Sequence, residues 1–149
     1  MKHKLWFLLI VCVCVGFPLS AQEKASKAPD HKWVAFESAD RLAVLWTSGD
    51  ADVAKKVAFI YTYNAKKQNW FEEVRFIVWG PSAKLLSQDK ELQEWIGKLK
   101  TVGVGLFACK WCSDSYGVSD QLAKLGIEVI YYGKPLTELL KTGWKVLTF

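Results

Sequence analysis

The sequence has few of the residues that mark common cofactor sites. Its 149 residues include two histidines, one methionine and four cysteines, and two of those cysteines, Cys12 and Cys14, lie in an N-terminal apolar run. Beyond that run only His31, Cys109 and Cys112 remain, too few for a four-ligand structural zinc site within one chain. No glycine-rich loop follows an apolar run, so no nucleotide-phosphate site is predicted. We therefore expect neither a metal nor a cofactor.

A large excess of one charge is also missing. The formal net charge is +5, with 51% hydrophobic and 23% charged residues, a composition that excludes a wholly disordered chain. Removing residues 1–21 would lower Lys+Arg from 20 to 18 against 15 Asp+Glu, a net charge of about +3. Such a mild excess is typical of a solvated surface, so nucleic acid is not an expected partner.

The first 21 residues have the pattern of a secretory signal peptide. Lys2 and Lys4 precede an apolar stretch from Leu5 to Val15, and small residues end at Ala21. A membrane-spanning helix needs about 20 apolar residues, and this stretch is shorter. We expect cleavage near Ala21, a periplasmic or secreted protein and no stable membrane span; retention as an anchor is the alternative.

The remaining chain divides into a polar arm and one domain. Residues 22–40 are mixed and mostly polar, as in a linker or N-terminal arm. From residue 41 to 149, short apolar runs alternate with helical periodicity. The expected strands are Leu42–Trp46, Val74–Trp79, Val102–Cys109, Ile127–Tyr132 and Trp144–Phe149.

This alternation predicts an α/β fold. Strands separated by helices pair in parallel through right-handed crossovers, which gives a three-layer α/β/α domain with a five-stranded, mainly parallel sheet. The first three strands are almost continuously apolar, as expected for strands buried on both faces. Glu128 and Lys145 interrupt the fourth and fifth strands, which we therefore place at the sheet edges.

The clearest chemical signal is the CxxC sequence from Cys109 to Cys112. It follows the third strand, and ligands of open parallel sheets bind beyond the carboxyl ends of strands. A helix start and the cation of Lys110 both favour a thiolate, so Cys109 is a candidate nucleophile and Cys112 a partner for it. The alternatives are a structural disulfide and a thioredoxin-type site, although the latter usually follows an earlier strand.

Aromatic residues at the same sheet edge predict a pocket around the thiols. Trp46, Trp79, Trp111 and Tyr132 follow or end strands, and they would either shield a sulfur intermediate from water or seal the core edge. Asp50 and Lys110 are included in this set of expected pocket-lining residues, although Asp50 also suits the role of a helix cap. Lys134 is interpreted as a solvated loop lysine.

Several segments together resemble the DsrE-like family. They are Trp46–Asp50, Val78–Ser82, Cys109–Cys112 with Tyr116–Val118, and Gly143–Phe149. The resemblance covers about residues 41–149 and implies a sulfur-relay fold that commonly forms trimers or hexamers. It also implies that Cys109 matches the cysteine that carries sulfur as a persulfide. The second cysteine and the signal-like segment depart from the single-cysteine cytoplasmic carriers and indicate an exported subgroup with a CxxC.

Three functional hypotheses follow. The first is a thiol-based sulfur carrier or transferase, in which Cys109 takes sulfur from a donor and Cys112 acts as the resolving thiol. Its partners would be a small sulfur species or a donor or acceptor protein. The second is a dithiol–disulfide oxidoreductase acting on protein partners. The third is a non-catalytic exported binding or assembly module with inert cysteines.

Overall fold

The structure is a computed structural model that describes residues 41–149. The predicted signal peptide (1–21) and arm (22–40) lie outside the described residues. The described chain forms one five-stranded sheet with the order β4-β3-β2-β1-β5 and every neighbouring pair parallel. Its strands are β1 Arg41–Trp46, β2 Glu73–Val78, β3 Gly105–Cys109, β4 Glu128–Ile130 and β5 Lys145–Thr148. The α/β fold with a parallel sheet is as predicted.

The edge positions predicted for the fourth and fifth strands are confirmed. β4 pairs only with β3, and β5 pairs only with β1. Glu128 and Lys145 are exposed at these edges, whereas β1 and β2 between them are largely buried. Burial on both faces therefore explains which strands are continuously apolar in the sequence.

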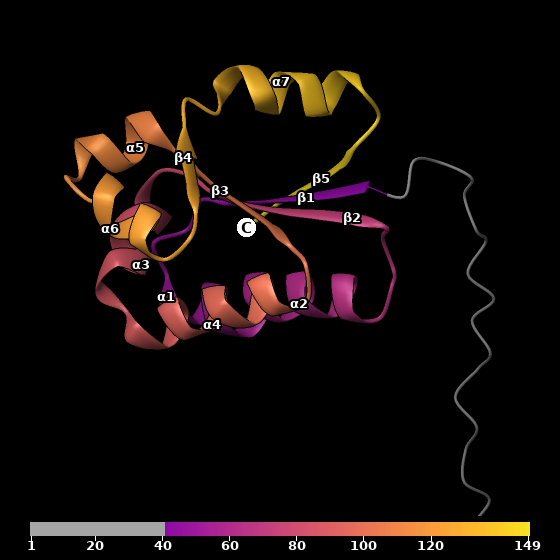
Figure 1. Cartoon of the computed structure of the whole chain (residues 1–149), viewed down its shortest axis with the longest axis horizontal. Helices are drawn as coiled ribbons and strands as arrows, with labels where there is room; N and C mark the ends of the chain where they lie inside the picture. Colours follow the sequence, from indigo (N-terminus) through magenta and orange to yellow (C-terminus); the bar gives the residue numbers. More distant parts are fainter. Residues whose placement is uncertain (1–40) are drawn as a thin grey trace, which may run out of the picture. The chain divides into compact units, whose positions relative to one another are not determined.

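The helices cover the two faces of the sheet unequally. They are α1 Ala51–Val53, the π-helical turn η1 Ala54–Ala58, α2 Phe59–Lys67, α3 Pro81–Gln88, α4 Lys90–Thr101, α5 Lys110–Ser115, α6 Ser119–Lys124 and α7 Gly133–Lys141. Figure 1 shows α7 on one face, α2 and α4 on the other, and α5 and α6 at the end where β3 finishes. The crossovers from β1 to β4 all step in one direction along the sheet, while the β4–β5 crossover steps back. Because crossovers are right-handed, only the returning helix, α7, is placed on the second face.

The larger part of the core lies on the face covered by α2 and α4. Trp46, Phe59 and Phe76 are fully buried there, with ring centroids 4.7–5.8 Å apart. The smaller core, under α7, contains Ile77, Tyr132 and both cysteines of the CxxC. Alternate residues of β2 thus support the two cores separately, because successive side chains of a strand point to opposite faces.

Each strand differs by one to three residues from its predicted bounds, and β3 differs most, at its start. The helical segment between β2 and β3 is divided in two, because the extended backbone of Asp89 ends α3 and its carboxylate caps α4 by accepting from the Leu92 N–H, 3.1 Å away. The third strand begins at Gly105 instead of Val102, because α4 continues to Thr101 and the turn at Gly103 (φ +86°) follows it. The strand therefore starts later than predicted, because the preceding helix is longer than expected.

Asp50 begins the first helical segment, and its substitution is expected to destabilise the domain. Its Oδ1 accepts from the N–H groups of Asp52 and Val53, at 2.7 and 3.1 Å. Asp50→Ala removes both bonds and should lower the free energy of unfolding by about 1 kcal/mol in urea denaturation. Asp50→Asn keeps a capping oxygen and should lie close to wild type. An equal loss in the two variants would contradict the capping role.

No helix among residues 41–149 is long and apolar enough to cross a membrane.

Candidate functional site

A cavity opens where the carboxyl ends of β2, β3 and β4 meet the start of α7. Its volume is about 460 Å³, within the range of small-molecule sites. The lining residues come from the three strand ends, from α5 and from α7; they are Trp79, Cys109, Trp111, Cys112, Tyr131, Tyr132, Gly133 and Lys134. The cavity therefore occupies the edge of the sheet at which parallel α/β proteins bind ligands.

The two cysteines lie side by side in the wall of this cavity. Cys109 ends β3 with an extended backbone and directly precedes α5, which contains Cys112. Each residue is only 5% exposed, so a reactant reaches the sulfurs through the cavity. Both are free thiols in the structure. The strand-to-helix junction thus brings together the pair that the CxxC spacing predicts.

The environment of Cys112 favours its protonated form. Burial raises the pKa of the Cys112 thiol, and hydrogen bonding to the Cys109 side chain raises it further. A hydrogen bond from the Gly80 backbone N–H acts in the opposite direction. A raised pKa makes Cys112 a poor first nucleophile and suits a residue that reacts second.

Alkylation against pH should report this raised pKa. An ordinary cysteine thiol titrates near 8.5, and only the thiolate reacts with iodoacetamide. Because the pKa of Cys112 is raised, less thiolate exists at any given pH, and its alkylation should rise only at a pH above that of a free cysteine. Peptide mass mapping after timed labelling measures this directly. Labelling of Cys112 with a midpoint at or below the ordinary value would contradict the assignment.

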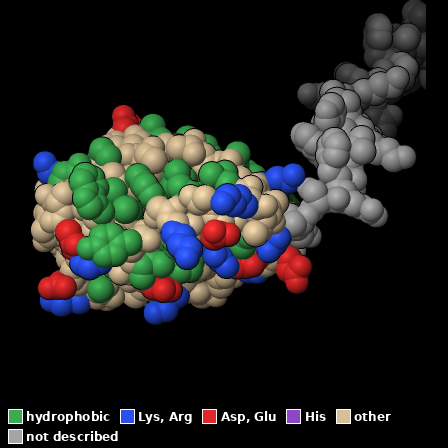
Figure 2. All heavy atoms as spheres, turned by 90° about the horizontal axis from the view of Figure 1, so that it is seen from above, with side chains coloured by type: hydrophobic (Ala, Val, Ile, Leu, Met, Phe, Trp, Pro, Cys, Tyr) green, Lys and Arg blue, Asp and Glu red, His purple; other side chains and the backbone are tan. Residues whose placement is uncertain are grey.

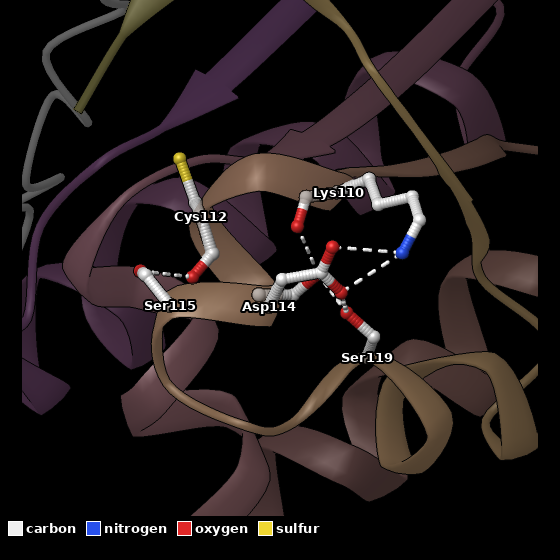
Figure 3. Close-up of polar contacts among 6 residues, drawn as sticks. Lys110, Cys112, Asp114, Ser115 and Ser119 are labelled. Atoms are coloured by element: carbon white, nitrogen blue, oxygen red, sulfur yellow. Dashed lines mark hydrogen bonds and ion pairs between the residues drawn. The ribbon is translucent and has the colours of Figure 1, made fainter.

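Polar contacts hold α5 against the start of α6. The Lys110 Nζ lies 2.8 Å from the Asp114 carboxylate, and the Ser113 and Ser119 hydroxyls are 2.7 Å apart. Ser119 also donates to Asp114. Figure 3 shows this network on one side of α5, with the Cys112 sulfur pointing away from it. The network therefore fixes the helix while leaving the thiol directed elsewhere.

The role expected for Lys110 needs correction. Its ammonium pairs with Asp114, a contact that raises the pKa of Lys110 and lowers the pKa of Asp114. Lys110 does not line the cavity. Its charge is neutralised by Asp114 four residues on, so it is a poor source of the thiolate stabilisation expected from its sequence position.

The structure separates the other residues that were expected to line one pocket. Trp79, Trp111 and Tyr132 do line the cavity with the thiols. Trp46 does not, because its side chain is fully buried against Phe59 on the opposite face of the sheet. Asp50 does not either, because its carboxylate caps the helix that follows β1.

Ser82 fixes the position of Trp79 at the cavity. Its hydroxyl donates to the Trp46 carbonyl at 2.6 Å and accepts from the Trp79 N–H at 3.0 Å. The Trp79 N–H also donates to the Trp46 carbonyl, at 2.9 Å. This fully buried serine therefore joins the ends of β1 and β2 and holds the backbone beside the thiols.

Three residues of the cavity wall were missed or misread in the sequence. Tyr131 follows β4, Gly133 and Lys134 begin α7, and all three line the cavity, although Lys134 is expected from the sequence to be a solvated loop lysine. The available signal was their place directly after a strand, at the ligand-binding edge of a parallel sheet. The adjacent Tyr132 is 1% exposed, and burial raises its pKa while the Arg75 guanidinium opposes the shift.

Within residues 41–149, no group of three or more His, Cys, Asp or Glu side chains is arranged to hold a metal ion. The described cavity wall presents two thiols, four aromatic rings and the ammonium of Lys134.

The fold and site define an α/β protein with a dithiol at the carboxyl edge of a parallel sheet. The sequence profile of the DsrE/DsrF-like family matches residues 40–149, and the chain belongs to that family. A search of curated proteins finds no match.

Two solved structures are similar to the domain. A conserved protein of unknown function from Bacteroides thetaiotaomicron is 36% identical, with a TM-score of 0.71 over 74% of this chain and 95% of that chain. The ychN protein from E. coli is 16% identical, with a TM-score of 0.59 over 73% of this chain and 98% of that chain, and it shows the fold alone. The family suggests a sulfur-relay type of function.

Proposed function

We propose that this protein is an exported, thiol-based sulfur carrier or sulfurtransferase, in which Cys109 accepts sulfur and Cys112 is the resolving thiol. The observation that carries the proposal is the pair of adjacent, 5% exposed thiols in the wall of a cavity. Cys109, which ends β3 and directly precedes α5, is assigned the first reaction, and the raised pKa of Cys112 suits the resolving role. Family membership supports a sulfur relay as the context.

The proposed reaction has two steps. The Cys109 thiolate attacks the outer sulfur of a hydropersulfide donor R–S–SH, the donor S–S bond breaks, and its electron pair leaves with R–S⁻. Cys109 then carries –S–SH. In the second step the Cys112 sulfur attacks the Cys109 sulfur, the persulfide bond breaks, and H₂S leaves with the Cys112 proton. The Cys109–Cys112 disulfide is then restored to two thiols by an external thiol reductant, or sulfur passes from Cys109 to an acceptor before resolution.

We also propose export by the N-terminal segment and assembly as a homo-oligomer, a trimer or a hexamer. Export rests on the charge and apolar pattern of residues 1–21. Support for assembly comes from exposed apolar side chains outside the cavity wall, such as Leu140, which is 61% exposed. Figure 2 shows hydrophobic side chains gathered on the face that carries α7. Large exposed apolar side chains of this kind are enriched at protein interfaces.

The direct test is the mass of the protein before and after exposure to polysulfide. The proposal expects a species heavier by one sulfur, and peptide mapping should place that sulfur on Cys109. An unrelated protein with one accessible thiol serves as the control for reagent activity. If that control gains sulfur while Cys109 does not, the carrier function is excluded.

A dithiol–disulfide oxidoreductase is the second candidate. The observation that favours it is the adjacency of two free thiols at the cavity, since such a pair can form a disulfide by exchange with a partner's disulfide and needs no sulfur donor. This function requires a Cys109–Cys112 reduction potential well above about −300 mV, below which structural disulfides lie. Equilibration with defined thiol–disulfide buffers measures the potential. A value below that limit excludes the oxidoreductase.

A further inference from the structure

We infer that the cavity selects a sulfur donor whose carrier group is apolar and preferably aromatic: an organic hydropersulfide R–S–SH in place of an inorganic sulfur oxyanion. The inference rests on the proposed function for its chemistry, but the cavity can be tested without that chemistry. Four of the eight lining residues are aromatic, and two others are the thiols. The reacting sulfurs are therefore approached past aromatic rings.

Positive charge in the wall is too limited for a multiply charged anion. Among the described residues that line the cavity, Lys134 is the only one with a charged side chain. Two other cations that approach the aromatic wall are engaged: Lys110, which lies 5.9 Å from the Tyr131 ring centroid, pairs with Asp114, and Arg75, which acts on Tyr132, pairs with Glu73, each at 2.7–2.8 Å. Thiosulfate carries two negative charges, and strong anion sites supply several charged or N–H donors. A single lysine matches the one negative charge of a leaving R–S⁻ group.

The residues beside Lys134 add no second positive charge to the described cavity wall. Tyr132 is a neutral phenol, because burial raises its pKa. The Arg75 guanidinium lies 4.4 Å from the Trp144 ring centroid, under α7 and not in the cavity wall. A donor with an apolar group would therefore enter without leaving a buried charge unpaired.

The size and mouth of the cavity also suit an organic group. About 460 Å³ is much more than a small inorganic ion requires and falls within the range for small-molecule ligands. Trp111 and Tyr131, which are 70% and 64% exposed, present aromatic surface at the cavity to solvent. Sulfur and aryl groups both make favourable contacts with aromatic rings. Burial of the R group would hold the donor with its S–S bond beside Cys109.

Binding can be tested without sulfur transfer. Thioanisole is a neutral aryl thioether that resembles the R–S end of the donor and exchanges no sulfur with thiols. In the Cys109→Ser protein it should bind and perturb tryptophan fluorescence, and Trp111→Ala should weaken binding about three- to tenfold through loss of an aromatic contact. Trp111 is exposed, so this substitution should leave the fold intact. Trp70→Ala removes a tryptophan that is 52% exposed and outside the cavity, and it should leave binding unchanged.

Donor competition then separates this inference from the proposed function. With the wild-type protein, an aryl hydropersulfide should load Cys109 faster than thiosulfate or a hydropersulfide with a charged carrier, and Trp111→Ala should reduce that preference. Equal loading by all donors, or no thioanisole binding, overturns the inference while sulfur on Cys109 still upholds the carrier function. Thioanisole binding without any sulfur loading overturns the carrier function and leaves an apolar binding cavity.

Discussion

Substitution of Cys109 by Ser should abolish sulfur uptake, whereas the same substitution at Cys112 should trap sulfur on the protein. A serine hydroxyl is almost fully protonated at neutral pH and is a far weaker nucleophile than a thiolate, so the Cys109→Ser rate should fall by about a thousandfold or more. Cys112→Ser keeps the attacking thiol and removes the group that resolves the persulfide. Its persulfidated form should therefore accumulate to a higher fraction than in wild type.

The two variants are matched controls for each other. Both change one sulfur to oxygen, both positions are 5% exposed, and they lie three residues apart in one wall. Intact mass measured at intervals after donor addition gives the loading rate and the lifetime of the loaded form. Sulfur uptake by Cys109→Ser at the wild-type rate, or identical behaviour of the two variants, is incompatible with the roles assigned to the thiols.

Much of the fold was predictable because the pattern of apolar and charged residues along each strand indicates how deeply that strand is buried. The apolar runs of β1 and β2 follow from burial on both faces, and Glu128 and Lys145 marked the edge strands. Helix ends were less predictable. The break at Asp89 depends on a capping bond from the Leu92 N–H, a local alternative that the apolar pattern around it does not reveal.

The candidate site was predictable where it depends on chain order and not where it depends on side-chain direction. Cys109 and Cys112 lie together because one ends a strand and the other is in the helix that directly follows it, and this does not depend on the order of the strands in the sheet. Trp46 also ends a strand, but its side chain points to the face covered by α2 and therefore does not line the cavity. Lys110 lies next to Cys109 in sequence, yet its flexible side chain reaches Asp114 instead.

The wall contributed by the β4–α7 connection depends on topology. Because only one crossover returns along the sheet, α7 covers the second face alone, and its first residues lie beside the strand ends. Tyr131 and Lys134 thereby join the thiols in one cavity. The sequence indicates that these residues follow a strand, but their meeting with the thiols depends on the strand order, in which β4 pairs with β3 and β5 returns to β1.

Phe76→Ala should be among the most destabilising single substitutions in the domain. The ring is fully buried in β2, with centroids 4.7 Å from Phe59 and 5.8 Å from Trp46. Truncation of such a residue leaves a cavity and costs about 3–5 kcal/mol, a large share of the 5–15 kcal/mol typical of a domain. Urea denaturation should show a lower midpoint with an unchanged slope.

Phe107→Ala is the matched control for this core. Phe107 is partly exposed in β3, on the face under α7, with its ring centroid 5.2 Å from Tyr132. The same truncation there should cost less free energy of unfolding, because less area leaves water on folding. Below its unfolding midpoint, Phe76→Ala should still load sulfur on Cys109, since the side chain of Phe76 faces away from the cavity. If Phe76→Ala lowers the free energy of unfolding no more than Phe107→Ala does, the larger core does not lie on the face covered by α2 and α4.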